Sequence, residues 1–151
     1  MKKIIAITCL FVFLVGCGTD SSTSSDTVVF HKTHEPKKSN APFSDAVQVG
    51  NLFFLSGQVG MDHGVRKLVE GGVTAETKQT LENIKAVLKE HGMKMEDVVK
   101  CTVILADIED FSSFNEVYKT YFPQKPARTT FAAKGLAVGA KIEIECIAVK
   151  Q

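Results

Sequence analysis

The sequence predicts an α+β domain in which a single β-sheet carries two helices on one face. Three observations predict this class. Several segments are rich in β-branched residues, two segments repeat apolar residues at helical spacing, and after an N-terminal hairpin the segments follow one another as β-α-β-α-β-β. Two helices cover only one face of such a sheet, so the other face meets either solvent or other subunits.

The N-terminal part of the domain is predicted to form a hairpin. Residues 27–33 (TVVFHKT) are expected to be the first strand and residues 51–60 (NLFFLSGQVG) the second. The backbone freedom of glycine predicts that the second strand breaks after Ser56 and Gly57. Residues 61–72 are expected to follow as a hairpin-like loop.

Two segments have the spacing of amphipathic helices. The first is predicted to be capped by Thr74, to run to about His91 and to stop at Gly92. The second covers residues 107–122 and ends before Pro123. Their predicted packing faces are Thr77, Leu81, Ile84 and Leu88 in the first helix, and Phe111, Phe114, Tyr118 and Tyr121 in the second.

Three further segments are predicted strands. Residues 98–105 (VVKCTVIL) are almost entirely apolar and β-branched, which is typical of a strand covered on both faces. Residues 127–133 and 141–149 are the last two strands, joined around residues 135–139. Alternation in the final strand gives one set under the helices (Ile142, Ile144, Cys146 and Ala148) and one on the opposite face (Lys141, Glu143, Glu145, Ile147 and Val149). The opposite face mixes carboxylates with apolar side chains, which favours a subunit interface or cleft and therefore a homo-oligomer.

The composition is typical of one soluble globular domain with a short extension. The chain has 151 residues, of which 44% are hydrophobic and 23% charged. The formal net charge is +1 without a basic patch, so binding to nucleic acid through phosphate neutralisation has no compositional support. The histidines, His31, His34, His63 and His91, show no metal-ligand clustering and are expected to be exposed. No metal site is predicted.

Residues 1–16 have the organisation of a secretory signal peptide. Lys2 and Lys3 precede an apolar run that is too short to span a bilayer well as a permanent helix. The run ends in LVGC, which resembles the bacterial lipobox and predicts that the Cys17 thiol receives a diacylglycerol and becomes the new N-terminus. The alternatives are an ordinary signal peptide cut elsewhere and an uncleaved anchor. Residues 17–26 are then the lipidated cysteine and a flexible polar tether, followed by one domain over residues 27–151.

The predicted location is outside the cytosol, on the periplasmic or cell-surface side of a bacterial membrane. Loss of Lys2 and Lys3 with the signal leaves 16 basic against 17 acidic side chains. Lipid on Cys17, rather than charge, is therefore expected to hold the protein at the membrane. Cys101 and Cys146 remain in the domain. A disulfide between them is one interpretation in an oxidising compartment, and buried free thiols are the favoured one.

Four blocks of the sequence resemble one protein family. They are APFSDAVQVGNLFFLSGQVG, TLENIKAVLKEHGMKMEDVVKCTVILADIEDFSSFNEVYKTYFP, PARTTF and KIEIECIAV, in this order within residues 27–151. Together they closely resemble the Rid family of reactive intermediate deaminases, formerly called YjgF-like. The resemblance implies a chorismate-mutase-like fold and a homotrimer with a central barrel and clefts between subunits. It also implies hydrolysis of enamines and imines, of the 2-iminobutanoate and 2-iminopropanoate type, to 2-oxo acids and ammonia without metal or cofactor.

The resemblance further implies roles for individual residues. Arg128 in PARTT matches the arginine that binds the substrate carboxylate, which its planar fork can hold bidentately. Glu143, the first glutamate of KIEIE, matches the residue that orients or activates the attacking water. Matching substrate-binding positions are Ser56, Gly57, Asn115, Phe43 and Thr130. From the residues alone, Arg128 could instead pair with Glu143 or Glu145 at a strand end.

Two positions depart from the pattern of many deaminating members. Phe43 stands where many have Tyr, and Thr130 stands where some have Cys. The missing hydroxyl at position 43 could lower activity or shift substrate preference. Export also separates the chain from the mostly cytosolic enzymes that release imino acids. Two alternatives therefore stay open, namely a non-catalytic small-carboxylate-binding or chaperone-like trimer at the membrane surface, and hydrolysis of a different C–N bond by Arg128 and Glu143.

Overall fold

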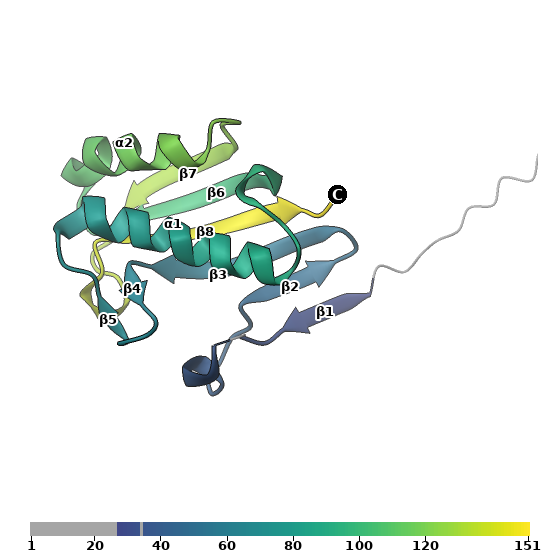
Figure 1. Cartoon of the computed structure of the whole chain (residues 1–151). Coiled ribbons are helices and arrows are strands. Elements are labelled where there is room, and N and C mark those ends of the chain that lie inside the picture. Colours follow the sequence, from purple (N-terminus) through teal and green to yellow (C-terminus); the bar gives the residue numbers. More distant parts are fainter. Residues whose placement is uncertain (1–26, 34) are drawn as a thin grey trace, which may run out of the picture.

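The computed structural model describes residues 27–33 and 35–151. The predicted signal peptide, the Cys17 lipidation site and the tether lie outside the described residues. Figure 1 shows one large sheet with both helices, α1 (Gly72–Glu90) and α2 (Phe111–Tyr121), on the same face. The 3-10 helices are η1 (Pro36–Lys38), η2 (Met95–Asp97), η3 (Ile108–Asp110) and η4 (Ala137–Gly139). Neither α1 nor α2 is long and apolar enough to cross a membrane, and the described ranges hold no other helix that could.

The large sheet has six strands in the order β1-β2-β3-β8-β6-β7. They are β1 (Val28–His31), β2 (Ala46–Val49), β3 (Leu52–Val59), β6 (Val98–Leu105), β7 (Ala127–Ala132) and β8 (Ile142–Val149). β6 and β7 are parallel, and the other neighbouring pairs are antiparallel. The predicted α+β class, with one mixed sheet and two helices on one face, is therefore confirmed. The predicted loop over 61–72 contains a separate two-stranded hairpin of β4 (Met61–Asp62) and β5 (Lys67–Leu68).

The N-terminal hairpin is built differently from its prediction. The prediction lacked β2, which pairs with β1 on one side and with β3 on the other. β2 has only four residues, too few to establish a period in the sequence. A two-residue turn at Gly50 and Asn51 joins β2 to β3, and Gly50 has a positive φ of 58°.

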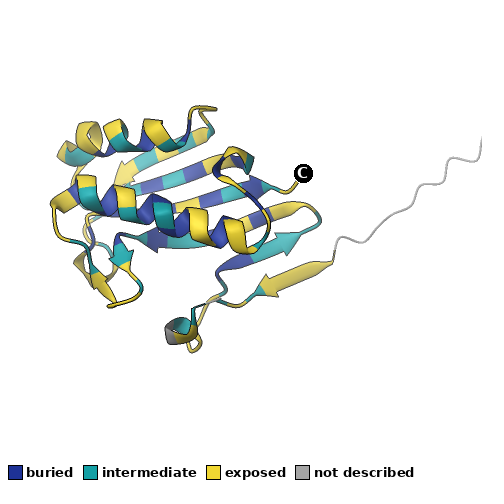
Figure 2. Cartoon of the chain, viewed as in Figure 1, coloured by how far each residue is buried: buried dark blue, intermediate teal, exposed yellow. Residues whose placement is uncertain are grey.

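The hydrophobic core lies between the helices and the sheet (Figure 2). All four predicted packing positions of α1, Thr77, Leu81, Ile84 and Leu88, are buried. α2 buries Phe114 and Tyr118, whereas Phe111 is exposed, contrary to the prediction, because α2 lies over β7 at the edge of the sheet. α1 begins at Gly72 rather than at the predicted Thr74 cap, since the left-handed residue before it, Gly71 (φ 114°), starts the helix.

The two faces of the sheet differ in burial. In β8 the predicted set Ile142, Ile144, Cys146 and Ala148 is buried beneath the helices. Side chains of the alternate set, such as Glu143 and Ile147, lie on the opposite face, which we call the open face. β6 alternates in the same way, with Cys101 buried and Lys100 exposed. The prediction that residues 98–105 are covered on both faces is therefore wrong within one chain, because both helices lie on one side (Figure 1).

Candidate functional site

Arg128 lies on the helix-facing side of β7. Its Cα is in register with that of Cys101 in β6, which is fully buried under the helices. The guanidinium extends toward α2, where Nη1 donates a hydrogen bond of 2.8 Å to Asn115 Oδ1. Arginine has five N–H donors, and this hydrogen bond uses one of them. The predicted site residues Arg128 and Asn115 are thus brought into direct contact.

Three aromatic rings of α2 surround the same guanidinium. Arg128 Cζ lies 4.7 Å from the ring centroid of Tyr118, 5.2 Å from that of Phe114 and 5.6 Å from that of Phe111. Cation–π contacts of this kind contribute about 0.5–2 kcal/mol each, and they hold the planar fork in one orientation. The helical spacing of these aromatics predicted a packing face. The sequence did not predict that these aromatic rings also contact Arg128.

Thr130 lies two residues after Arg128 on the same side of β7, in register with the buried Val103. Its Oγ1 atom is buried, and none of the described residues gives it a hydrogen-bond partner. Arg128, Asn115 and Thr130 therefore form one group at the helix-facing side, which we call the arginine group.

Glu143 lies on the open face of β8, between the buried residues Ile142 and Ile144. Its nearest feature is a β-bulge in β3, where the pairing with β8 shifts register between Leu55 and Gln58. A bulge adds a residue to one strand and redirects its side chains, and bulges are frequent beside active sites. The glutamate is therefore placed at an irregular point of an otherwise regular sheet.

The bulge contains the predicted residues Ser56 and Gly57. Ser56 Oγ donates a hydrogen bond of 2.6 Å to the Ser44 carbonyl oxygen, which fixes the bulge against the segment that carries Phe43. Glu143 packs directly on Gly57, since a Cβ atom added there would lie closer than 3.0 Å to Glu143 Oε1. Glycine is thus required here by close approach of the carboxylate and not by a positive φ.

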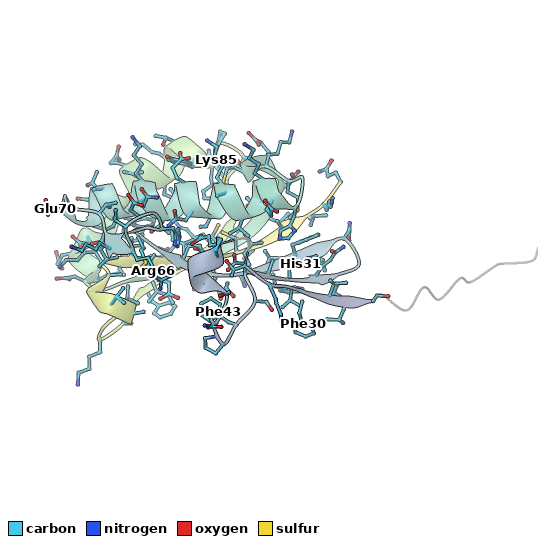
Figure 3. The ribbon with its side chains drawn as sticks, turned by 60° about the horizontal axis from the view of Figure 1, so that its bottom comes forward. Phe30, His31, Phe43, Arg66, Glu70 and Lys85 are labelled. Atoms are coloured by element: carbon cyan, nitrogen blue, oxygen red, sulfur yellow. The ribbon has the colours of Figure 1, made fainter. Side chains whose placement is uncertain are left out.

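A cavity of about 640 Å³ adjoins the bulge. Its lining includes four predicted site residues, Phe43, Ser56, Gly57 and Glu143. Phe43 is 54% exposed, and Figure 3 shows it on the side of the molecule away from Lys85 of α1. We call these four residues the glutamate group. The same cavity is lined by polar side chains that the sequence did not single out.

The unpredicted residues are Glu35, Lys38 and His63, whose side chains are 17%, 12% and 20% exposed. Glu35 contacts Lys38 at 3.2 Å and His63 Nδ1 at 2.8 Å, and Lys38 and His63 line the cavity. Burial and then the charge of Lys38 lower the pKa of His63. The prediction that the histidines are exposed is wrong for His31, His63 and His91, which are all half-buried because segments far apart in sequence meet around them. No periodic signal could have revealed this contact.

The Glu143 carboxyl has a raised pKa. Burial is the larger cause, and the negative charge of Glu145, two residues along the same face, adds to it. A carboxylate with a raised pKa is a stronger base than an ordinary glutamate, which suits it to accept a proton from water. Perturbed carboxyl groups in a cavity are frequent at functional sites.

The arginine group and the glutamate group lie on opposite faces of one sheet. Arg128 is in register with the buried Cys101 and lies on the helix-facing side, whereas Glu143 belongs to the β8 side chains on the open face. Among the described residues no ion pair joins Arg128 to Glu143 or Glu145, so the suggested pairing at a strand end is wrong within one chain. Its physical reason is the two-residue period of a strand, which sends the side chains to different sides.

No group of three or more His, Cys, Asp or Glu side chains within residues 27–33 and 35–151 could hold a metal ion. The two groups therefore offer hydrogen bonds, one fixed cation and one perturbed carboxyl. These side chains suit recognition of a small carboxylate and proton transfer to or from water.

Comparison with known proteins assigns the family. A family model described as Endoribonuclease L-PSP matches residues 32–150. The chain belongs to this family. A mouse protein named 2-iminobutanoate/2-iminopropanoate deaminase is 48% identical over 110 residues, which cover 72% of this chain and 82% of the mouse protein.

Two solved structures of the family extend the comparison. The yeast protein YEO7 is 38% identical with a TM-score of 0.77, and the match covers 83% of this chain and 100% of the yeast chain. RidA from the Antarctic bacterium Psychrobacter sp. PAMC 21119 is 39% identical with a TM-score of 0.69, over 72% of this chain and 89% of that chain. The Rid resemblance predicted from the four sequence blocks is therefore confirmed at the level of family and fold.

Proposed function

We propose that this chain is a hydrolase that deaminates reactive enamines and imines of the 2-iminobutanoate and 2-iminopropanoate type to 2-oxo acids and ammonia. The observation that carries the proposal is the 48% identity, over most of both chains, to a relative named for this reaction. The site residues agree with it, because the chain keeps both an arginine fork for a carboxylate and a perturbed glutamate for water.

In the proposed reaction, Arg128 binds the substrate carboxylate while Glu143 accepts a proton from water. The water oxygen forms a bond to the carbon of the protonated C=N group, whose π electrons move to nitrogen. The resulting carbinolamine then releases ammonia as its C–N bond breaks, and the C=O bond of the 2-oxo acid forms as the hydroxyl proton passes to water. Glu143 can return its proton to the departing nitrogen. Ser56, Gly57, Phe43, Asn115 and Thr130 are assigned to substrate binding in this proposal.

The functional unit in this proposal is a homotrimer. Two apolar rows cross the open face in register, and an open apolar surface of this kind favours association. They are Phe30, Val47, Phe54 and Ile147, and Val28, Val49, Leu52 and Val149. Phe30 is 68% exposed and Phe54 is 42% exposed in the single chain. Copies of the same chain would cover these rows, as the family resemblance implies for a central barrel.

Assembly would also complete the active site. Arg128 and Glu143 lie on opposite faces of one chain, and one small substrate must touch both. A cleft between two copies can unite the arginine group of one with the glutamate group of its neighbour. Neither group by itself supplies both carboxylate binding and water activation.

The test is hydrolysis of 2-iminopropanoate, generated in solution by an amino-acid oxidase, by a chain of residues 27–151. The family model matches residues 32–150, and the match to the yeast structure covers the whole yeast chain, so this part is expected to fold alone. Loss of the imine should be faster than in buffer, and Arg128→Ala should abolish the acceleration while circular dichroism and sedimentation stay unchanged. A wild-type chain that binds 2-oxobutanoate but leaves the imine rate at the buffer value would contradict the proposal.

The family description names an endoribonuclease, but the composition does not favour RNA as the substrate. The chain is nearly neutral, with 18 basic and 17 acidic side chains, and offers no charge excess to neutralise phosphates. The comparisons give no support to a non-catalytic carboxylate-binding or chaperone-like role either. Imine hydrolysis therefore stands as the proposed activity.

Location and domain organisation are proposed from the sequence alone. Residues 1–16 act as a signal peptide, Cys17 carries lipid, and residues 27–151 form the deaminase domain outside the cytosol. Mass spectrometry of the full chain expressed in bacteria should find a mature N-terminus at Cys17 with added acyl mass. Cys17→Ser should remove that mass, and an unprocessed N-terminus in the wild type would contradict the assignment.

A further inference from the structure

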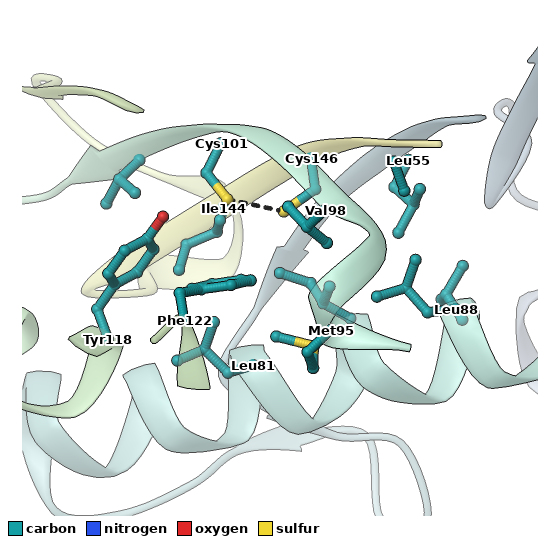
Figure 4. Close-up of a cluster of buried hydrophobic side chains, with 14 of the residues drawn as sticks. Leu55, Leu81, Leu88, Met95, Val98, Cys101, Tyr118, Phe122, Ile144 and Cys146 are labelled. Atoms are coloured by element: carbon teal, nitrogen blue, oxygen red, sulfur yellow. Dashed lines mark hydrogen bonds between the residues drawn. The ribbon is translucent and has the colours of Figure 1, made fainter. Parts of the chain in front are cut away.

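A pair of cysteines lies beneath the arginine group, unused by the proposed chemistry. Cys101 of β6 and Cys146 of β8 are opposite each other in the antiparallel pair, and both are free thiols. Their sulfur atoms are 3.3 Å apart, as the dashed line in Figure 4 marks. Directly opposed residues in antiparallel strands have Cα atoms about 4.5–5.5 Å apart, which lies within the range that a disulfide spans. Bond formation would need the sulfur atoms to approach by about 1.2 Å.

We propose that Cys101 and Cys146 are a redox site, in which a peroxide converts the buried dithiol into a reversible disulfide that joins β6 to β8. The proposal stands independently of the deaminase reaction. The favoured interpretation of two buried free thiols is confirmed, and the proposal adds a reaction to it, because the two sulfur atoms are neighbours.

The surroundings distinguish the two thiols. A hydrogen bond from Cys146 lowers the pKa of Cys101, and the Tyr118 hydroxyl and the charge of Arg128 add to this effect against the burial that opposes it. The hydrogen bond with Cys101 and burial raise the pKa of Cys146. Cys101 is therefore the attacking sulfur.

The reaction is balanced with one peroxide. The Cys101 thiolate attacks a peroxide oxygen, the O–O bond breaks, and a sulfenic acid and one water form. The Cys146 sulfur then attacks the sulfenic sulfur, the S–S bond forms, and a second water leaves with the Cys146 proton. The dithiol loses two electrons and two protons, and the peroxide becomes two waters.

Burial selects the oxidant. Cys101 is 0% exposed and Cys146 is 3% exposed, so larger thiol reagents cannot reach either sulfur in the folded chain. Hydrogen peroxide is small enough to enter when the sheet opens locally. Oxidation should therefore take minutes to hours with millimolar peroxide, and a bulky aromatic disulfide reagent should react with Cys101 and Cys146 only after unfolding.

Tyr118 links the redox site to the arginine group. Its buried hydroxyl acts on the Cys101 thiol, whose pKa it lowers, and its ring lies 4.7 Å from Arg128 Cζ. Figure 4 shows this hydroxyl directed toward the strand that carries Cys101. The chain has two tyrosines and no tryptophan, so its ultraviolet fluorescence comes from Tyr118 and Tyr121. A disulfide quenches a neighbouring tyrosine, so emission should fall on oxidation and return on reduction.

The test treats the full-length chain with hydrogen peroxide, blocks residual thiols after unfolding, and maps tryptic peptides by mass. The expected product joins the peptide 101–119 to the peptide 142–150 with the loss of two hydrogens, which also excludes pairing with Cys9 or Cys17. The crosslink closes a long loop in the unfolded chain and should raise Tm by about 10 °C, reversed by dithiothreitol.

Cys146→Ala is the matched control, which should give neither the linked peptide nor the gain in Tm. If this variant fails to fold, the reversible oxidation of the wild-type chain carries the test. Unchanged thiols, or a sulfinic acid on Cys101 without the linked peptide, would overturn the proposal. A linked peptide without any gain in Tm would also overturn it, since the bridge would then not join native strands.

Discussion

The arginine group and the glutamate group contrast in how much of each is finished within one chain. Arg128 is held by Asn115 and by three aromatic rings of α2, on the side of the sheet where the core supplies rigid neighbours. Glu143 lies on the open face beside a cavity, with the exposed Phe43 as part of its wall. The arginine group is preorganised by the fold of the chain. The glutamate group is open on the side that a further copy would cover in the proposed trimer.

The difference teaches where each property of the proposed site originates. Orientation of a cation requires fixed neighbours, and a helix packed on a sheet provides them. A water-activating carboxyl requires access for substrate and a raised pKa, which partial burial and Glu145 provide. Splitting these tasks between two faces makes oligomerisation part of the proposed catalysis and not only of stability.

The largest predicted effect comes from mixing two inactive variants. Arg128→Ala and Glu143→Gln should each lower kcat/KM by roughly 10²-fold or more. When the two variants are unfolded together in equal amounts and refolded, about a quarter of the sites should contain both wild-type residues if each site uses two copies. Recovery of about a quarter of the wild-type rate is expected in the imine assay.

Each variant refolded alone is the control for this experiment, and it should stay inactive. A mixture as inactive as its components would mean that Arg128 and Glu143 must act from the same chain. The proposed division of the site between copies would then be wrong.

The next effect concerns the contact between Gly57 and Glu143. Gly57→Ala places a Cβ atom closer than 3.0 Å to Glu143 Oε1, so the carboxyl must move. A displacement of about 1 Å can cost roughly 10²-fold in rate, and we expect a loss of this order in kcat. Gly135→Ala is the matched control, because its added Cβ has no atom within 4 Å. Equal rates for the two variants would show that the position of Glu143 is unimportant.

A smaller effect is expected from Arg128→Lys. Lysine keeps the positive charge but lacks the planar fork that contacts Asn115 and is proposed to bind the substrate carboxylate. We expect kcat/KM for 2-iminopropanoate to fall roughly 10-fold to 100-fold, less than for Arg128→Ala. Steady-state kinetics of the two variants decide the point. Identical losses would mean that charge contributes nothing, and full activity of the lysine variant would mean that the fork is dispensable.

The smallest effect is a shift of the pH profile. The ionised form of Glu143 is the proposed base, so kcat should fall as pH is lowered through its pKa. The charge of Glu145 raises that pKa, so Glu145→Gln should lower it and move the acidic limb to lower pH. Glu116→Gln removes the same charge from the exposed side of α2 and should leave the limb in place. If the acidic limb of the pH profile moves equally in both variants, the net charge of the protein and not the nearby charge of Glu145 sets the pKa of Glu143.

The sequence predicted the elements that depend on local patterns. The period of α1 identified four of its nine buried positions, and the two-residue period of β8 correctly assigned Ile142 and Glu143 to opposite faces of the sheet. Failures occurred where the pattern was too short or the partner was distant. β2 has four residues and no clear period, and Phe111 has the spacing of a core residue but lies at the sheet edge.

The candidate site residues also divide into those that the sequence indicated and those that depend on distant contacts. The residues Arg128, Glu143, Ser56 and Asn115 came from the family resemblance, because isolated polar residues carry no periodic signal. The cluster of Glu35, Lys38 and His63 was missed, since it joins a segment before β2 to the β4–β5 hairpin. Contacts between such segments depend on how loops meet in space.

By itself, the sequence determined the fold class, the family and the face of β8 on which Glu143 lies, because helical and strand periods are local properties of the chain. Only the tertiary structure decided that Arg128 contacts α2, that Cys101 and Cys146 touch, and that Arg128 and Glu143 are separated by the sheet. These relations follow from the strand order β8-β6-β7 and its register. Strand order is set by long-range packing, and no local period encodes it.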